Sequence, residues 1–226
     1  MQGQLSACDL ASRIDHTNLS PDATASDIAS LCAEAQEYGF AAVCVSPIRV
    51  ADAVAAIRDG AVAICAVVGF PSGAHLSAIK AAEAAVCVRE GAREIDMVAN
   101  LGWLKDGQWD RYAEDLRLVR NTIGGATLLK VIIEASALDE ADIVRAGIMA
   151  AQSGANYIKT STGVYGQARL EDVSLLRRAL PPDIKIKAAG GIRTVGQARA
   201  FIAAGADRIG ASAGVGMMWE RCGKPH

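Results

Sequence analysis

The stretch "GANYIKTSTG", Gly154 to Gly163, decides the fold, because it joins a glycine to a short apolar run that ends in a lysine. Related stretches recur along the chain as "GFAAVC" (39–44), "GAREID" (91–96) and "GADRIG" (205–210). Each begins with a glycine that fits the C-terminal end of a helix, and each continues as a short strand. The repeat therefore predicts a chain in which helices and strands alternate.

Eight short runs of strand character follow this pattern, with helix-like segments between them. In 110–121 and 172–180, apolar residues recur at spacings of three and four, as on one face of a helix. The expected strands are 13–15, 40–45, 62–68, 93–98, 127–134, 156–160, 184–188 and 207–210. This alternation predicts an α/β protein with the (β/α)8 TIM-barrel fold and one domain, residues 1–226. A doubly wound open sheet is the alternative, although no GxGxxG motif follows the first strand.

Composition excludes several classes of function. A net charge of -2 with 21% charged residues provides no basic field for nucleic acid or an anionic membrane. No run approaches the ~20 apolar residues of a membrane span, and the first residues lack the pattern of a signal peptide. We therefore expect a cytoplasmic protein. The six cysteines include no CxxC pair and the three histidines no metal-binding pair, so we expect mostly buried free thiols and no metal site.

The glycine-led repeat also aligns four residues. Counting five from each glycine gives Cys44, Asp96, Lys159 and Gly210, on the second, fourth, sixth and eighth expected strands. Alternate strands of such a barrel contribute side chains to the same interior layer. The four residues should therefore share one layer near the C-terminal ends of the strands, where barrel enzymes hold their chemistry.

Lysine in a strand points to amine chemistry. The chain has 16 arginines but only seven lysines, and only a primary amine can form an imine. In "IKIKAAGGIR", period-two alternation turns Lys185 and Lys187 toward the barrel interior, with Lys187 beside Lys159 and Lys185 a layer lower in a structural role. Burial beside a second cation favours a neutral amine, so we expect Lys159 to be nucleophilic. Asp96 is then a general acid and base, or else a plain salt-bridge partner.

Two glycine-bearing turns, "AAGGIRT" (188–194) and "IGASAG" (209–214), follow the last two strands. Backbone N–H groups in such turns, with a helix N-terminus, form the phosphate cup common in these barrels. The candidate binding residues are Gly190, Gly191, Gly210 and Ser212, with Thr162 and Gly163 of "TSTG" at the rim.

A family resemblance rests on motifs in order from about residue 13 to 216. They are "RIDHTNLSPDAT", "AAVCVSP", "VVGFPSG", "EIDMVANLG", "KVIIEAS", "YIKTSTG", "IKAAGGIRT" and "ADRIGASAG". Together they resemble the deoxyribose-phosphate aldolases, which are class I aldolases. The resemblance implies a barrel that reversibly cleaves 2-deoxy-D-ribose 5-phosphate to D-glyceraldehyde 3-phosphate and acetaldehyde, in deoxyribose phosphate catabolism. It also implies a covalent lysine imine, with no metal or other cofactor.

By motif, the resemblance makes Lys159 the Schiff-base lysine, Asp96 the proton-transfer aspartate and Lys187 the second lysine, which tunes the first. Asp15 and Thr17 of "IDHT" match residues at the substrate end of the first strand. For Cys44, a pocket-lining role and a buried thiol remain equally open. The resemblance, like the frequency of twofold assembly, implies a homodimer or a higher homo-oligomer.

Three departures from the family pattern bear on substrate binding and turnover. Val164 stands where some members carry a lysine that reaches the phosphate, and Ala213 where many have a second serine. We therefore expect phosphate binding to depend more on backbone N–H groups and Ser212. No tyrosine follows Tyr165, whereas some members use a C-terminal tyrosine in proton transfer. The alternatives are an aldolase for another small phosphorylated aldehyde or ketone, and a non-catalytic phosphosugar-binding barrel.

Overall fold

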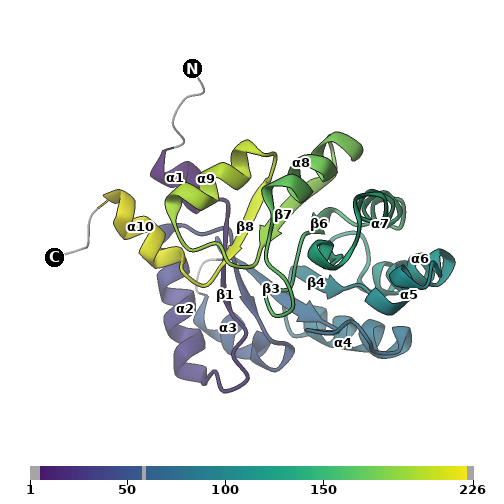
Figure 1. Ribbon diagram of the computed structural model, residues 1–226. Coiled ribbons are helices and arrows are strands. Elements are labelled where there is room, and N and C mark those ends of the chain that lie inside the picture. Colours follow the sequence, from purple (N-terminus) through teal and green to yellow (C-terminus); the bar gives the residue numbers. More distant parts are fainter. Residues whose placement is uncertain (1–5, 58–59, 223–226) are drawn as a thin grey trace.

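The computed structural model describes residues 6–57 and 60–222, which form a closed barrel of eight parallel strands (Figure 1). Each strand pairs with its neighbour in the sequence, and the last pairs with the first. The TIM-barrel prediction is confirmed, and the doubly wound alternative is wrong, because an open sheet would leave two edge strands unpaired. The strands are β1 (Ile14–Asn18), β2 (Ala42–Val45), β3 (Ala63–Val68), β4 (Glu94–Val98), β5 (Leu128–Ile132), β6 (Tyr157–Lys159), β7 (Lys185–Ala189) and β8 (Arg208–Ala211).

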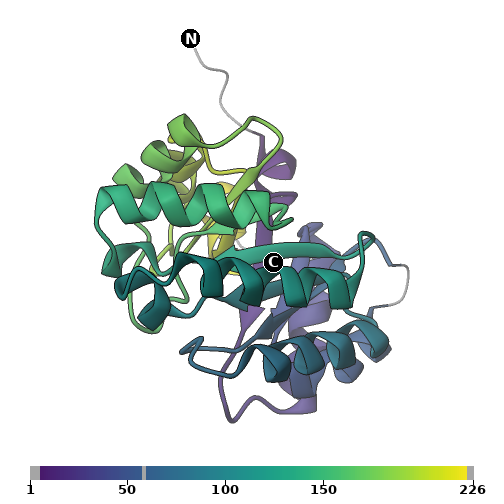
Figure 2. The same ribbon diagram turned by 90° about the vertical axis from the view of Figure 1, so that its right-hand side faces the viewer.

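Helices cover the outside of the strands, as the turned view in Figure 2 shows. The helical periodicity expected at 110–121 and 172–180 lies in α6 (Trp109–Ile123) and α8 (Leu170–Ala179). The other helices are α1 (Ala7–Ala11), α2 (Ala25–Tyr38), α3 (Val50–Ala56), α4 (Ser77–Arg89), α5 (Leu101–Lys105), α7 (Glu140–Gln152), α9 (Val195–Ala203) and α10 (Gly214–Cys222), with 3-10 turns at Pro47–Arg49 and Ala135–Ala137. Among the described helices, none is long and apolar enough to cross a bilayer.

The main hydrophobic core lies between the strands and this helical layer. Strand residues such as Ile95, Leu129 and Ile158 point outward and are fully buried against helix residues such as Leu116 and Leu176. Burial of each such side chain contributes about 1.5–3 kcal/mol. Because side chains alternate along a strand, this outward apolar set leaves every second residue to face the barrel interior.

The glycines of the repeat have the conformation that their position requires. Gly39, Gly91, Gly154 and Gly205 all have positive φ, at 68°, 114°, 92° and 112°. Gly39 ends α2 in the left-handed region, and its N–H donates to the Ala35 carbonyl. This conformation turns the chain from each helix into the next strand at little steric cost only for glycine. The recurring glycine therefore sets where each of these strands begins.

The barrel interior has an apolar side and a charged side. Ala42 and Cys44 of β2 pack with Cys65 and Val67 of β3 in a small buried cluster. The remaining strands carry the charged interior side chains described below. Four of the described cysteines, Cys32, Cys44, Cys65 and Cys87, are buried free thiols as expected, whereas Cys8 is exposed.

Gly73 tests how tightly the loop after β3 packs. Its φ is +67°, and a Cβ there would lie 2.0 Å from the Ala99 carbonyl oxygen. Gly39 has nearly the same φ, +68°, but a Cβ there meets nothing within 4 Å. We expect Gly39→Ala to lower the free energy of unfolding by about 1 kcal/mol, and Gly73→Ala by at least about 2 kcal/mol more. Urea denaturation measures both; equal losses would contradict the tight packing.

Candidate active site

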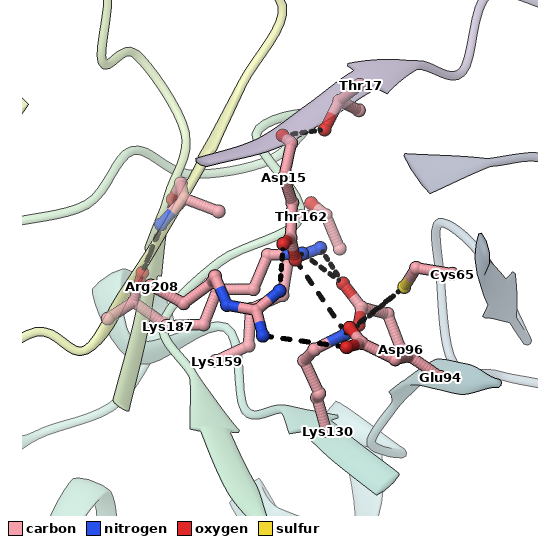
Figure 3. A network of polar contacts seen from close by, with 12 residues as sticks. Asp15, Thr17, Cys65, Glu94, Asp96, Lys130, Lys159, Thr162, Lys187 and Arg208 are labelled. Atoms are coloured by element: carbon pink, nitrogen blue, oxygen red, sulfur yellow. Dashed lines mark hydrogen bonds and ion pairs between the residues drawn. The ribbon is translucent and has the colours of Figure 1, made fainter. Parts of the chain in front are cut away.

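Asp96 lies at the centre of the charged side of the barrel, in contact with three lysines (Figure 3). Its Oδ2 accepts hydrogen bonds from Lys159 and Lys187, each at 2.8 Å. Its Oδ1 accepts from Lys130 at 2.8 Å and from the Cys65 thiol at 3.0 Å. The strand register explains why these side chains contact one another. Asp96 is the Cα partner of Lys130, and Lys159 is the Cα partner of Lys187. The structure thus brings together the three residues proposed for catalysis.

The ion pairs continue into a closed circuit of alternating charge. Lys130 lies 2.5 Å from Glu94, and Arg208 lies 3.5 Å from Glu94 and 2.5 Å from Asp15. Lys187 pairs with Asp15 and returns the circuit to Asp96. We call this set the charge ring; its members are Asp96, Lys130, Glu94, Arg208, Asp15 and Lys187. Lys159 is bonded to the ring from outside, through Asp96.

Electrostatics holds the ring in its ionised form. Burial alone would raise the pKa of Asp96, but Lys130, Lys159 and Lys187 outweigh it and hold the pKa well below the usual range. The pKa of Asp15 is lowered in the same way, against the cost of burial, by Lys187, Lys130 and Arg208. Burial alone would lower the pKa values of Lys130 and Lys187, and the neighbouring carboxylates raise both. At neutral pH these two lysines are therefore cations.

A pocket of about 650 Å³ opens above this network, at the C-terminal ends of the strands. Lys159 lies on its floor and is 3% exposed, whereas Lys130 and Lys187 are fully buried. Among the described lysines of the network, Lys159 is the one that lines the pocket. The other proposed site residues on the pocket wall are Thr17, Thr162, Gly163, Gly190, Gly191, Gly210 and Ser212.

Four proposed site residues lie below the pocket surface. Asp96, Lys187 and Asp15 belong to the charge ring, so Asp15 lies at the level of the lysines and not at the strand end. Thr17 lies above it and donates to the Asp15 carbonyl oxygen at 2.9 Å. Of the two possibilities for Cys44, the structure places it as a buried thiol.

Cys44 lies beneath Leu19 and Phe70, which line the pocket. A hydrogen bond with Cys65, together with Lys187 and Lys159, lowers the pKa of Cys44 to about 7 despite burial. The potential ligand atoms of Cys44, Cys65 and Asp96 lie within 4.8 Å of one another. They do not fit a metal ion, because both Asp96 oxygens already accept from lysine ammonium groups and those cations would repel it.

Glu134 shapes the "TSTG" loop that follows Lys159. It adopts a left-handed φ of 50° and is buried. Its Oε2 accepts from the Thr162 backbone N–H at 3.1 Å and from the Thr162 hydroxyl at 2.7 Å. This buried carboxylate therefore fixes the loop over the pocket, and no expectation from the sequence included it.

The turns after β6, β7 and β8 meet at one end of the pocket. A Cβ on Gly163 would lie 3.3 Å from the Gly190 Cα, so the two loops touch backbone to backbone. Gly210 makes room in the interior, since a Cβ there would lie 3.0 Å from the Cε of Lys187. Arg193 also lines this end, and α10 begins at Gly214 just beyond Ser212. Glycine backbone, a guanidinium and a helix N-terminus suit an anion.

Three ring members were missed from the sequence, namely Lys130, Glu94 and Arg208. Each is an inward-facing residue by strand alternation, two residues from another interior position, and the same period-two argument that selected Lys187 would have selected them. Lys185 was expected in the interior one layer below Lys187. It lies at the exposed start of β7, with its ammonium 5.7 Å from the Tyr157 ring centroid.

A barrel with a primary amine on the floor of an anion-binding pocket, beside a buried carboxylate, defines a class of enzymes that handle carbonyl compounds through imines. A family model described as DeoC/LacD family aldolase matches residues 10–218. The chain belongs to this aldolase family and is therefore a lyase.

Similar proteins agree with this assignment. The chain is 47% identical to a deoxyribose-phosphate aldolase of Geobacillus, over 93% of this chain and 95% of that protein. It is 49% identical to deoxyribose-phosphate aldolase 1 of Cutibacterium acnes, over 92% and 96%. The solved structure of the Aeropyrum pernix deoxyribose phosphate aldolase superposes with a TM-score of 0.85 at 33% identity, covering 94% of this chain and 91% of that one.

The lowered pKa of Asp96 predicts how stability depends on pH. An unfolded aspartate has a pKa of about 3.9, so below about pH 5 the unfolded chain binds more protons than the folded one. The stability that Asp96 contributes is present above that range and is lost as the pH falls. We expect Asp96→Asn to flatten the acid loss of unfolding free energy by up to about 1 kcal/mol per pH unit. Urea denaturation from pH 3 to 6 measures this.

A surface carboxylate provides the control for this experiment. Asp183 is exposed, and Asp183→Asn should leave the acid slope as in the unmodified protein. An Asp96→Asn slope equal to that of Asp183→Asn would show that the buried ion pairs do not govern acid stability.

Proposed function

We propose that the protein is a class I aldolase that reversibly cleaves 2-deoxy-D-ribose 5-phosphate to D-glyceraldehyde 3-phosphate and acetaldehyde, with Lys159 as the nucleophile. The observation that carries the proposal is the position of Lys159. It lies on the pocket floor and pairs with Asp96 at 2.8 Å, whereas Lys130 and Lys187 are fully buried beneath the pocket. The names of the relatives supply the substrate, and the pocket offers a place for its phosphate.

The reaction begins when the Lys159 amine adds to C1 of the open-chain aldehyde and water leaves, which forms an iminium ion. The iminium draws electrons from the C2–C3 bond, which breaks while the C3 hydroxyl loses its proton. Asp96, held as an anion, orients that hydroxyl or a water that takes the proton. D-glyceraldehyde 3-phosphate leaves, the enamine takes a proton at C2, and hydrolysis releases acetaldehyde and frees Lys159. No step requires a metal or another cofactor.

Lys187 serves this scheme as a permanent cation. It shares Asp96 Oδ2 with Lys159, so any charge on Lys159 lies close to a second positive charge. Lys187 also supplies a donor for proton movement around Asp96.

The phosphate belongs, in this proposal, at the end of the pocket formed by Gly190, Gly191, Ser212 and Arg193. Val164 is 58% exposed at the pocket edge and offers no charge. Among the described residues of the pocket wall, Arg193 is then the one that brings a positive charge to this end. Backbone N–H groups and the start of α10 complete the site.

We also propose that the chain assembles into a homo-oligomer. A homodimer or a higher oligomer fits the family, and the related Aeropyrum pernix enzyme is described as tetrameric. A cytoplasmic location fits a sugar-phosphate substrate. We further propose that residues 1–226 form one domain with its active site at the C-terminal ends of the strands.

Reductive trapping tests the nucleophile. With 2-deoxy-D-ribose 5-phosphate and cyanoborohydride, peptide mass spectrometry should find the adduct on Lys159. Lys159→Met should abolish labelling and lower kcat by at least about 10³-fold. Lys105→Met, on the exposed end of α5, should change neither. Labelling elsewhere with turnover intact in Lys159→Met would refute the assignment, and no labelling at all would favour the non-catalytic barrel.

Arg193→Gln tests the phosphate site. Losing a charged hydrogen bond should raise KM for the phosphorylated sugar about 10-fold or more, while kcat/KM for unphosphorylated 2-deoxyribose stays unchanged. Arg178→Gln, an exposed arginine on α8, should alter neither substrate. Equal losses on both sugars would place the phosphate elsewhere, and faster cleavage of another sugar phosphate in a panel would favour the alternative substrate.

A further inference from the structure

The charge ring is electrically balanced without Lys159. Its six members comprise three carboxylates and three cations in strict alternation around the circuit. Asp15 and Lys130 also face each other across the ring at 3.7 Å. Buried charges are tolerated when each is paired, and here every ring member touches two members of opposite sign. A proton on Lys159 therefore adds a charge that the ring has no carboxylate to match.

Two members of the charge ring, Glu94 and Lys130, lie away from the pocket and do not contact Lys159. Glu94 begins β4 and touches Lys130 and Arg208, and Lys130 is fully buried on β5. Neither lines the pocket. Lys130 reaches Lys159 through Asp96, because the two lysines hold the two oxygens of the same carboxylate. Glu94 reaches Lys159 through Lys130 and Asp96 in turn.

We propose that Glu94 and Lys130 are positioning residues that set the protonation state of Lys159 by keeping the charge ring neutral. The inference rests on the proposed role of Lys159 as the imine-forming amine. Removing Glu94 leaves the ring with a positive excess, which disfavours the Lys159 ammonium. Removing Lys130 leaves a negative excess, which the Lys159 ammonium would neutralise. The two changes therefore act in opposite directions.

Charged and titratable groups face Lys159 from the barrel interior and from the pocket wall. The carboxylates and cations of the ring come from β1, β4, β5, β7 and β8, and the two cysteines contribute thiols from β2 and β3. Around the pocket the charged groups lie farther out, on β1, on α2 and on loops. Among the described residues these groups are Asp15, His16, Asp27, Glu34, Cys44, Cys65, Glu94, Asp96, Lys130, Glu134, Lys187, Arg193 and Arg208.

The test measures Lys159 labelling by acetaldehyde and cyanoborohydride from pH 5 to 9, by peptide mass spectrometry. Acetaldehyde carries no titrating group, so the labelling midpoint reports the protein. A unit charge two or three contacts from Lys159 should move this midpoint by about 1 pH unit. We expect Glu94→Gln to move it to lower pH and Lys130→Met to higher pH. The double variant restores neutrality and should return it close to the original value.

Control variants distinguish an effect of charge on the labelling midpoint from an effect of misfolding. Lys130→Arg keeps the charge and should keep the midpoint, even if the rate falls. The thiol of Cys44 titrates near the same range, so the opposite shifts should also appear in the Cys44→Ser background. Circular dichroism and thermal unfolding identify variants that do not fold. If Lys130→Met fails to fold, Glu94→Gln alone decides the matter.

The outcomes distinguish the two hypotheses. Opposite shifts and their cancellation in the double variant support the inference. A Glu94→Gln midpoint that does not move, or that moves to higher pH, overturns it while leaving Lys159 as the nucleophile. Absence of Lys159 labelling in the unmodified protein overturns the proposed function itself.

Discussion

The contact of Asp96 with three lysine side chains is the interaction on which the rest of the structure depends. All four side chains are at least 96% shielded from solvent, and an isolated ion in such a place would lose several kcal/mol of hydration. The cost is tolerable because the charges alternate in a closed circuit that includes Asp15, Glu94 and Arg208. The barrel must therefore hold five strands, β1, β4, β5, β7 and β8, in one register for the interior to be stable.

The geometry of the strands, and not of the loops, holds these charged side chains in register. Parallel register makes Lys187 the Cα partner of both Lys159 and Arg208, so three basic side chains from β6, β7 and β8 lie side by side. Gly210, with no side chain, leaves the space that Lys187 fills. The other side of the interior, built from β2 and β3, holds the small cluster of Ala42, Cys44, Cys65 and Val67 and no lysine, arginine or carboxylate among its members. Rigid strands thus hold the amine and the carboxylate at a fixed separation, which the proposed imine chemistry requires.

The loops have a separate task, which is to shape the pocket above this fixed floor. Glu134 holds Thr162, the glycines of neighbouring loops touch, and Arg193 with the start of α10 favours an anion at one end. This separation of strands from loops explains how one site combines a strongly charged floor, from which water is excluded, with a polar opening. Lys159, the proposed nucleophile, lies where the two levels meet, and Val164 makes the opening less charged than the family pattern would suggest.

The sequence by itself determined the strands, the barrel, and the alignment of Asp96 with Lys159 and Lys187. These follow from local signals, namely the glycine that ends a helix and the two-residue alternation of a strand. Only the tertiary structure decided that Lys130, Glu94 and Arg208 close a ring, that Cys44 lies beneath the pocket, and that Glu134 holds the "TSTG" loop. The contacts of the charge ring and of Glu134 join residues from 28 to 193 positions apart. Local pattern indicates which way a side chain faces, whereas the partner it meets depends on the register between strands.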